Sequence, residues 1–153
     1  MPDNDLIRLN ITIKPPAEAA SRAIEYSRAL ARRYEAEFVL DGINFFPHIT
    51  LYSPVFPEKN LDQIIETVGA WSGGLGKVDC IFHKAADENG FVILECVPIP
   101  ELTGLHNSAV NSLNPLREGR HKAKYDTPEY QAGLSDEQKY NIAAYGYANI
   151  MNL

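Results

Sequence analysis

The sequence has few cysteines and few basic residues, and it contains no long apolar run. Its two cysteines, Cys80 and Cys96, are too few for a disulfide scaffold in a chain of 153 residues. No Cys-x-x-Cys pair is present, so the sequence does not indicate a zinc site of the usual spacing. No apolar run approaches the ~20 residues that span a bilayer. The start, MPDNDLIRLN, is acidic and lacks the apolar core of a secretory signal. We therefore expect a cytoplasmic protein with no membrane partner.

Basic residues are outnumbered by acidic ones, 14 against 20, which gives a net charge of −6. This balance argues against a protein that holds nucleic acid by a broad basic surface. One basic cluster is nevertheless present, within residues 117–124, and it comprises Arg117, Arg120, His121, Lys122 and Lys124. Two interpretations remain open: the cluster steers a phosphate or an RNA end, or it is a solvated loop.

The length suits one domain with a sizeable core, and apolar periodicity predicts how its elements follow one another. Alternation predicts strands over 6–14, 37–40 and 47–52, and a hairpin over 77–97 with its turn at 87–90. Helical spacing predicts helices over 17–34, 61–71, 100–116 and from Ser135 to about Tyr145, and an aperiodic loop between the last two. The pattern predicts an α+β fold with mostly antiparallel strands and two lobes, the first ending at about residue 54.

In the predicted hairpin, one register brings the apolar residues of both strands to the same face. That register makes Cys80 and Cys96 neighbours and leaves Asp79, His83 and Glu95 on the other face. We interpret His83 as a structural residue and His106 as a surface residue, and neither as catalytic.

The segment NFFPHITLYSP, residues 44–54, carries the strongest indication of chemistry. In a strand His48, Thr50 and Tyr52 share one face, while Ile49 and Leu51 face a core. Histidine transfers protons near neutral pH, and a threonine hydroxyl two residues away donates to an oxygen of the same substrate, which suits a phosphodiester. The alternative is a structural histidine that does no chemistry.

Three further residues are candidates for substrate binding. The ring of Tyr52 either stacks on a base or packs in the core. Arg8 and Asn10 lie on the polar face of the first strand. They contact the phosphate if that strand lies beside the one that carries His48, and otherwise they face solvent.

FFPHITLYSP, preceded by a strand and a helix, resembles the first motif of the two-histidine (2H) phosphoesterase superfamily, which includes 2′,5′ RNA ligase-like proteins and cyclic phosphodiesterases. The LIRLNITIKP strand, the hairpin, the ELTGLHNSAV helix and the YGYANIMNL ending also fall where such proteins have comparable elements, so the resemblance covers nearly the whole chain. It implies a single bilobal domain over residues 1–153, with antiparallel sheets, helices outside and a central cleft. It also implies a hydrolase that needs no metal or cofactor, with His48 and Thr50 catalytic and a 2′,3′-cyclic phosphate or a 2′,5′-linked RNA end as substrate.

The sequence departs from the family in one respect. Each lobe of such proteins carries a His-x-Thr/Ser motif, yet none of His83, His106 and His121 is followed by x-Thr/Ser. We therefore expect the C-terminal end to be incomplete and phosphodiesterase activity to be impaired. One alternative is a non-catalytic protein that binds a nucleotide or an RNA end. Another is a self-associating structural protein, such as a homodimer formed through an exposed sheet edge.

Overall fold

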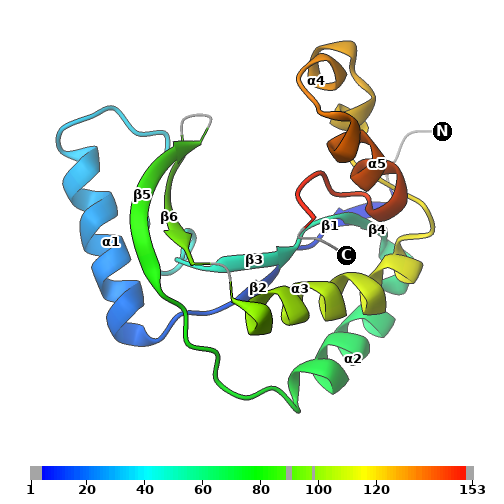
Figure 1. Cartoon of the computed structure of the whole chain (residues 1–153), viewed down its shortest axis with the longest axis horizontal. Coiled ribbons are helices and arrows are strands. Elements are labelled where there is room, and N and C mark those ends of the chain that lie inside the picture. The colour runs from blue at the N-terminus through cyan, green and yellow to red at the C-terminus, as the bar shows by residue number, and fades with distance from the viewer. Residues whose placement is uncertain (1–4, 89–90, 98, 151–153) are drawn as a thin grey trace. The chain divides into compact units, whose positions relative to one another are not determined.

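The computed structural model describes residues 5–88, 91–97 and 99–150. These residues form an α+β fold that contains five α-helices and three two-stranded sheets (Figure 1). The predicted α+β class is thereby confirmed. The chain divides into two compact units. The larger unit comprises Met1–Leu9 and Tyr52–Leu153, and the smaller unit comprises Asn10–Leu51.

The smaller unit contains β2 (Ile11–Ile13), α1 (Ala17–Ala31) and most of β3 (Ile49–Tyr52), and β2 pairs with β3. Pro16 is the extended residue before α1, where a fixed φ suits a helix start. No strand forms over 37–40, so that prediction was wrong. The reason lies in a competing partner, because the backbone N–H of Leu40 donates to Ser27 Oγ at 3.0 Å. Leu51 is the single fully buried residue of this unit, so its own core is small.

The larger unit begins with β1 (Leu6–Arg8), which pairs antiparallel with β4 (Val55–Pro57) so that Arg8 lies opposite Val55. The strand predicted over 6–14 is therefore divided: its first half pairs with β4 and its second half with β3. The sequence did not predict β4, because Pro54 and Pro57 indicated a break. Proline is nevertheless tolerated at the end of a short strand that lies at the edge of its sheet.

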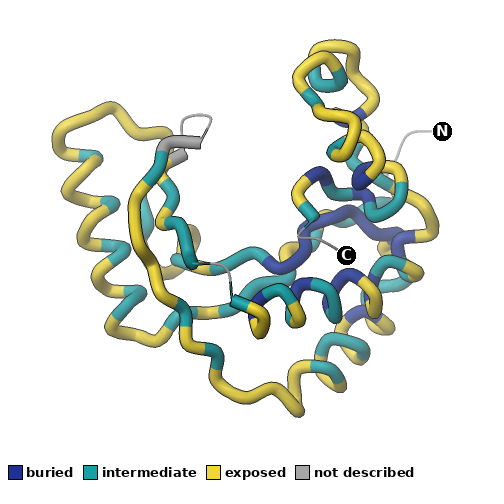
Figure 2. The backbone as a smooth tube through the Cα atoms, in the orientation of Figure 1, coloured by how far each residue is buried: buried dark blue, intermediate teal, exposed yellow. Residues whose placement is uncertain are grey.

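The core of the larger unit is built from β4, α2 (Leu61–Ser72) and α3 (Pro100–Leu113), whose buried stretches are dark in Figure 2. Its buried side chains include Phe56, Ile64, Leu102, Val110 and Leu113. His106 is also buried, with 1% of its surface exposed, so the expectation of a surface histidine was wrong. It lies one helical turn after Leu102 and therefore on the buried face of α3.

The C-terminal part of the larger unit contains more helix than predicted. The supposed aperiodic loop holds the short helices η3 (Ala123–Asp126) and α4 (Pro128–Ala132). A start signal for α4 was present, since Thr127 caps the helix and proline occupies its first turn. The last helix, α5 (Asp136–Tyr145), begins as predicted. Ser135 and Gln138 form a reciprocal capping box.

The predicted hairpin forms from β5 (Phe82–Glu88) and β6 (Phe91–Cys96), in antiparallel pairing. Asn89 and Gly90 of the predicted turn lie outside the described residues. Phe82 lies opposite Cys96, and a bulge follows before Lys84. The predicted placement of His83 and Glu95 on one face agrees with their contact, 3.7 Å between Nε2 and Oε2.

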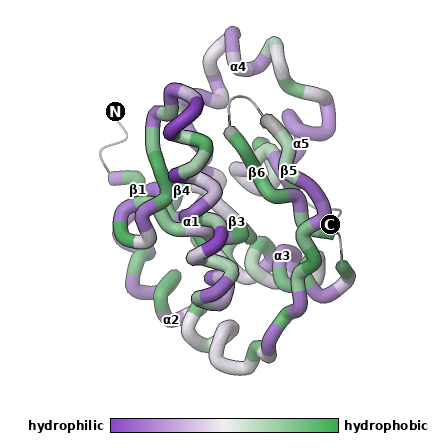
Figure 3. Tube along the Cα trace, turned by 90° about the vertical axis from the view of Figure 1, so that its left-hand side faces the viewer, coloured by the Kyte–Doolittle hydropathy of each residue, from purple (hydrophilic) through white to green (hydrophobic). Residues whose placement is uncertain are grey.

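The side chains on one face of this hairpin remain open to solvent. Phe82, Val92 and Leu94 are each more than a third exposed, and Figure 3 shows that β6 is mostly apolar. Within the described part of the chain, no helix combines the length and apolar character needed to cross a membrane.

Candidate functional site

His48 is the centre of the candidate site, and two contacts determine which of its nitrogens carries the proton. Nδ1 lies 2.8 Å from the carbonyl oxygen of Phe46. Because that oxygen only accepts, neutral His48 carries its proton on Nδ1. Nε2 then holds the lone pair, and it accepts from the Nδ2 amide of Asn10 at 3.2 Å. The exposed ring thus presents its basic nitrogen in a fixed orientation.

The pairing of β2 with β3 explains why Asn10 reaches His48. Asn10 comes directly before β2, and His48 comes directly before β3. Each residue therefore flanks one strand of the same two-stranded sheet, and both belong to the smaller unit. Sequence reasoning selected both residues, and the structure brings them together.

Phe46 and Lys14 extend the site beside His48. The rings of Phe46 and His48 lie 5.3 Å apart between centroids and are tilted by 54°. The Nζ of Lys14 lies 5.9 Å from the centroid of the Phe46 ring, within cation–π range. Sequence reasoning missed both residues as site components. For Lys14 a signal was available, since alternation places it on the same polar face of the first predicted strand as Asn10.

A tight loop built on Asp41 leads the chain into this site. The Asp41 Oδ1 accepts backbone N–H groups from Ile43 at 2.7 Å, Asn44 at 2.9 Å and Phe45 at 3.0 Å. Gly42 supplies a positive φ of 85°, which glycine adopts without strain. The N–H donors of Phe45 and Ile43 lower the pKa of Asp41 to about 2. The loop is therefore held by a charged carboxylate at neutral pH.

Thr50 lies on β3, two residues after His48, and its side chain is partly exposed. Strand alternation places both side chains on the same face. The hydroxyl is thus available near the imidazole, as the sequence pattern predicts.

Tyr52 lies in the core of the larger unit, with 0% of its surface exposed. Its hydroxyl donates to the carbonyl oxygen of Tyr145 at 2.5 Å. The rings of Phe56 and Tyr147 meet it edge-on, at centroid distances of 6.4 and 6.2 Å. Burial raises the pKa of Tyr52 to about 12. Of its two predicted roles, packing agrees with this burial, because the ring has no exposed face on which a base could stack.

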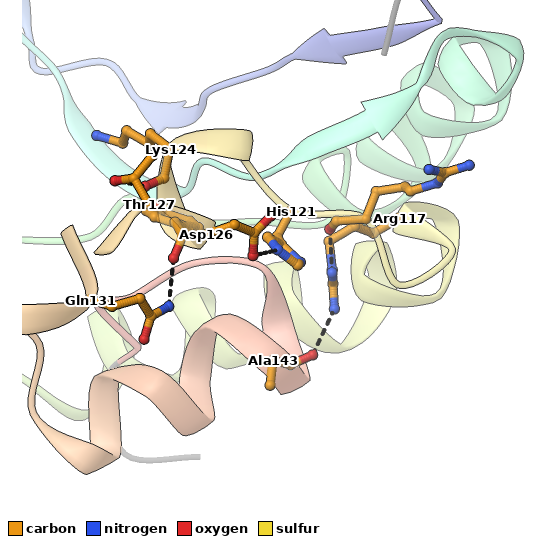
Figure 4. A network of polar contacts seen from close by, with 9 residues as sticks. Arg117, His121, Lys124, Asp126, Thr127, Gln131 and Ala143 are labelled. Atoms are coloured by element: carbon orange, nitrogen blue, oxygen red, sulfur yellow. Dashed lines mark hydrogen bonds and ion pairs between the residues drawn. The ribbon is translucent and has the colours of Figure 1, made fainter. Parts of the chain in front are cut away.

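Arg117 is also buried, with 2% of its surface exposed, although the sequence placed it in an exposed basic cluster. Its guanidinium donates to Asn114 Oδ1 at 3.1 Å, to the carbonyl oxygen of Ala144 at 3.0 Å and to that of Arg120. A further contact with Ala143 is drawn in Figure 4. Burial lowers the pKa of Arg117 below its ordinary value. Arg117 is a structural residue, tied to backbone carbonyls.

Two further predicted residues, His121 of the basic cluster and Arg8 of the first strand, also lie in the larger unit. The Nε2 of His121 lies 2.8 Å from the Asp126 carboxylate, and Figure 4 shows the two side chains facing each other. Arg8 is exposed on β1 in the larger unit. There it lies close enough to Lys122 to lower the pKa of that lysine.

Among the described residues, no three His, Cys, Asp or Glu side chains are grouped closely enough to hold a metal ion. A scan against models of protein families, a search of curated proteins and a search of solved structures each found no match.

Proposed function

We propose that the chain binds the cyclic phosphate or 2′,5′-linked end of a nucleotide or RNA at His48 and Thr50, and that it hydrolyses such phosphodiesters slowly, as a 2H-type phosphodiesterase. The observation that carries the proposal is the fixed tautomer of His48. Phe46 holds the proton on Nδ1, so Nε2 carries the lone pair and can accept a proton once a substrate displaces the Asn10 amide. A two-lobed 2H fold with a central cleft and a cytoplasmic location belong to the same proposal.

The contact between Asn10 and His48 indicates how a substrate would fit. In the free protein the amide donor of Asn10 and the lone pair of Nε2 satisfy each other. A substrate that brings both a hydroxyl group and a phosphate oxygen can replace both partners at once. The hydroxyl then donates to Nε2, and the amide of Asn10 donates to the phosphate oxygen.

The proposed reaction follows from this geometry. A water molecule bound at Nε2 of His48 attacks the phosphorus of a 2′,3′-cyclic phosphate. As the new P–O bond forms, Nε2 takes the water proton, and the P–O bond to one ribose oxygen breaks. That oxygen takes a proton from a solvent water molecule and becomes a hydroxyl group, the imidazolium of His48 returns its proton to the solvent, and a phosphate monoester remains. Thr50 donates to a phosphate oxygen throughout.

The expected rate is low, because His48 is the single histidine of the smaller unit. A positioned proton-transfer group typically supplies ~10²–10⁴-fold, so a site with one histidine lacks a factor of this size. The same observation favours our second candidate, a protein that binds a nucleotide or an RNA end without turning it over.

Self-association is a third candidate, favoured by the solvent-exposed apolar face of the β5–β6 hairpin. Exposed apolar patches rimmed by polar residues mark interaction sites in many proteins. If a homodimer covers this face, the molar mass measured by light scattering should rise from that of a monomer to that of a dimer as the protein concentration increases.

The test compares hydrolysis of a 2′,3′-cyclic nucleotide by the unchanged chain, by His48→Ala and by His83→Ala. We expect slow turnover that disappears in His48→Ala, together with weaker substrate binding. His83 is a matched control, because it is an exposed histidine paired with a carboxylate on the hairpin. Unchanged turnover and binding in His48→Ala would exclude His48 as the functional residue. Binding without turnover in the unchanged chain would favour the second candidate.

A further inference from the structure

Three cationic side chains gather in the larger unit, apart from the residues assigned to His48. Arg8 comes from β1, Lys122 is the residue directly before η3, and Lys124 lies in η3. Arg8 and Lys124 both lie close enough to Lys122 to repel its charge. Arg8 also acts electrostatically on the hydroxyl of Tyr125. Segments more than a hundred residues apart in sequence therefore bring like charges together.

Ion pairs with acidic side chains are absent from this cluster among the residues that the structure describes. Within the described part of the chain, none of the three cations forms an ion pair with an Asp or Glu side chain. Asp126 is the nearest acid in sequence, and its carboxylate is engaged by His121 at 2.8 Å. A chain with a net charge of −6 thus keeps three positive groups together, and no described carboxylate forms an ion pair with them.

Tyrosine rings hold the two ammonium groups in place. The Nζ of Lys122 lies 5.5 Å from the ring centroid of Tyr147 and 5.8 Å from that of Tyr125. The Nζ of Lys124 lies 4.9 Å from the ring centroid of Tyr130 and 5.7 Å from that of Tyr125. Such contacts orient an ammonium group but leave its charge intact. Orientation before binding lowers the entropy that a ligand must overcome.

The surroundings of Lys122 disfavour its positive charge. Partial burial, with repulsion from Arg8 and Lys124, lowers the pKa of Lys122 to about 8. A negative ligand would offset the repulsion and favour the charged amine. A ligand of high negative charge density therefore relieves the repulsion among the three cations most effectively.

We propose that Arg8, Lys122 and Lys124 form a second binding site, for the phosphate group of a nucleotide. Arginine and lysine supply several charge-assisted donors from two directions, which suits the oxygens of a phosphate group. This site involves only residues of the larger unit and does not depend on the role proposed for His48.

The experiment is a titration with inorganic phosphate, AMP and adenosine, followed by NMR on protein whose lysines carry ¹³C-methyl groups. At low salt and pH 7.5, phosphate and AMP should shift the Lys122 and Lys124 signals and raise the pKa of Lys122 from about 8. Adenosine should not do so, and AMP binding should weaken as pH rises from 7 to 10. Equal shifts with adenosine, or a Lys122 pKa that phosphate leaves unchanged, would contradict the proposal.

The variants separate charge from packing. Lys122→Met keeps an apolar stem for the tyrosine rings, and Arg8→Gln alters an exposed residue. Each should weaken AMP binding about tenfold or more, the scale of one charge-assisted hydrogen bond. Lys139→Met, an exposed lysine on α5, is the matched control and should bind AMP normally. His48→Ala should also leave the Lys122 shifts intact. Normal AMP affinity in both Lys122→Met and Arg8→Gln would overturn the assignment.

Discussion

The side-chain amide of Asn10 lies 3.2 Å from Nε2 of His48, although the residues are separated by 38 positions in the sequence. An amide nitrogen only donates, so this contact is compatible with neutral His48 only when Nε2 is unprotonated. Together with the Phe46 carbonyl at Nδ1, it selects one of the two neutral tautomers. Two neighbours therefore select the neutral tautomer in which Nε2 carries the lone pair.

Replacing Asn10 by Asp should favour a proton on Nε2 of His48 in place of the lone pair. A carboxylate beside Nε2 accepts instead of donating, so the doubly protonated imidazole is favoured. In the variant the charged ring should persist to higher pH than in the unchanged chain, which an NMR titration of the ring protons measures. Turnover of a 2′,3′-cyclic nucleotide near neutral pH should fall. Asn10→Ala provides the comparison, because it removes the contact without adding charge. Identical titrations of Asn10→Asp and the unchanged chain would show that the contact is not formed in solution.

The Asp41 loop should make the smaller unit sensitive to acid. The pKa of Asp41 is lowered from 3.8 to about 2 by backbone N–H donors. A carboxylate with a depressed pKa stabilises the folded state above its unfolded pKa, and this stabilisation is lost as pH falls through the folded value. Between pH 4 and pH 2 the unchanged chain should therefore lose stability more steeply than Asp41→Asn. Denaturant unfolding at several pH values measures both slopes. Equal slopes would mean that these hydrogen bonds do not hold the carboxylate.

The sequence predicted elements best where a local rule decides them. The start of α5 was predicted because the capping box of Ser135 and Gln138 needs only four residues. The prediction of burial was wrong for His106. Its polar residue type was given more weight than its position in the helix, one turn after the buried Leu102. Burial of Arg117 could not be predicted, since its partners include carbonyls of α5, far along the chain.

The candidate site was predicted in the same uneven way. His48 and Thr50 are two residues apart in sequence, so strand alternation alone indicated their shared face. Asn10 required the further assumption that two distant strands pair, which β2 and β3 satisfy. Arg8 lies only two residues from Asn10 but falls in the other unit, because the strand pairing changes partner between them. Short-range pattern gives no information about such a change.

The thiol of Cys80 should react slowly. Burial is the main cause that raises its pKa, and the neighbouring Cys96 thiol raises it further. The predicted proximity of the two cysteines is thereby confirmed, and both are free thiols. The thiolate is the reactive form, so in Cys96→Ala, where only Cys80 remains, iodoacetamide at pH 8 should alkylate it more slowly than free cysteine. Alkylation as fast as that of free cysteine would show that Cys80 is more accessible than the structure indicates.

Two glycines with positive φ allow the most direct test of the packing around Arg117. Gly146 ends α5 with φ 67°, and Gly119 has φ 75°. A Cβ added at Gly146 would lie 2.5 Å from Arg117 Cδ and 2.9 Å from the Arg120 carbonyl oxygen, whereas one added at Gly119 would meet nothing within 4 Å. Both substitutions by alanine carry the left-handed backbone cost of roughly 1–2 kcal/mol. Only Gly146→Ala also forces the buried guanidinium away from its carbonyl acceptors, which leaves polar groups unsatisfied at about 1–3 kcal/mol.

Gly146→Ala should therefore lower the free energy of unfolding by more than Gly119→Ala does, with a difference of about 1–3 kcal/mol. Denaturant titrations of the two variants measure that difference directly, and the shared backbone cost cancels in the comparison. A small difference would require Arg117 to find other acceptors without loss. That outcome is unfavourable on physical grounds, because its present acceptors include the Asn114 side chain and the last turn of α5. Asn114 in turn donates to the carbonyl oxygen of Ala144, so a displaced guanidinium would disturb a connected network rather than a single hydrogen bond.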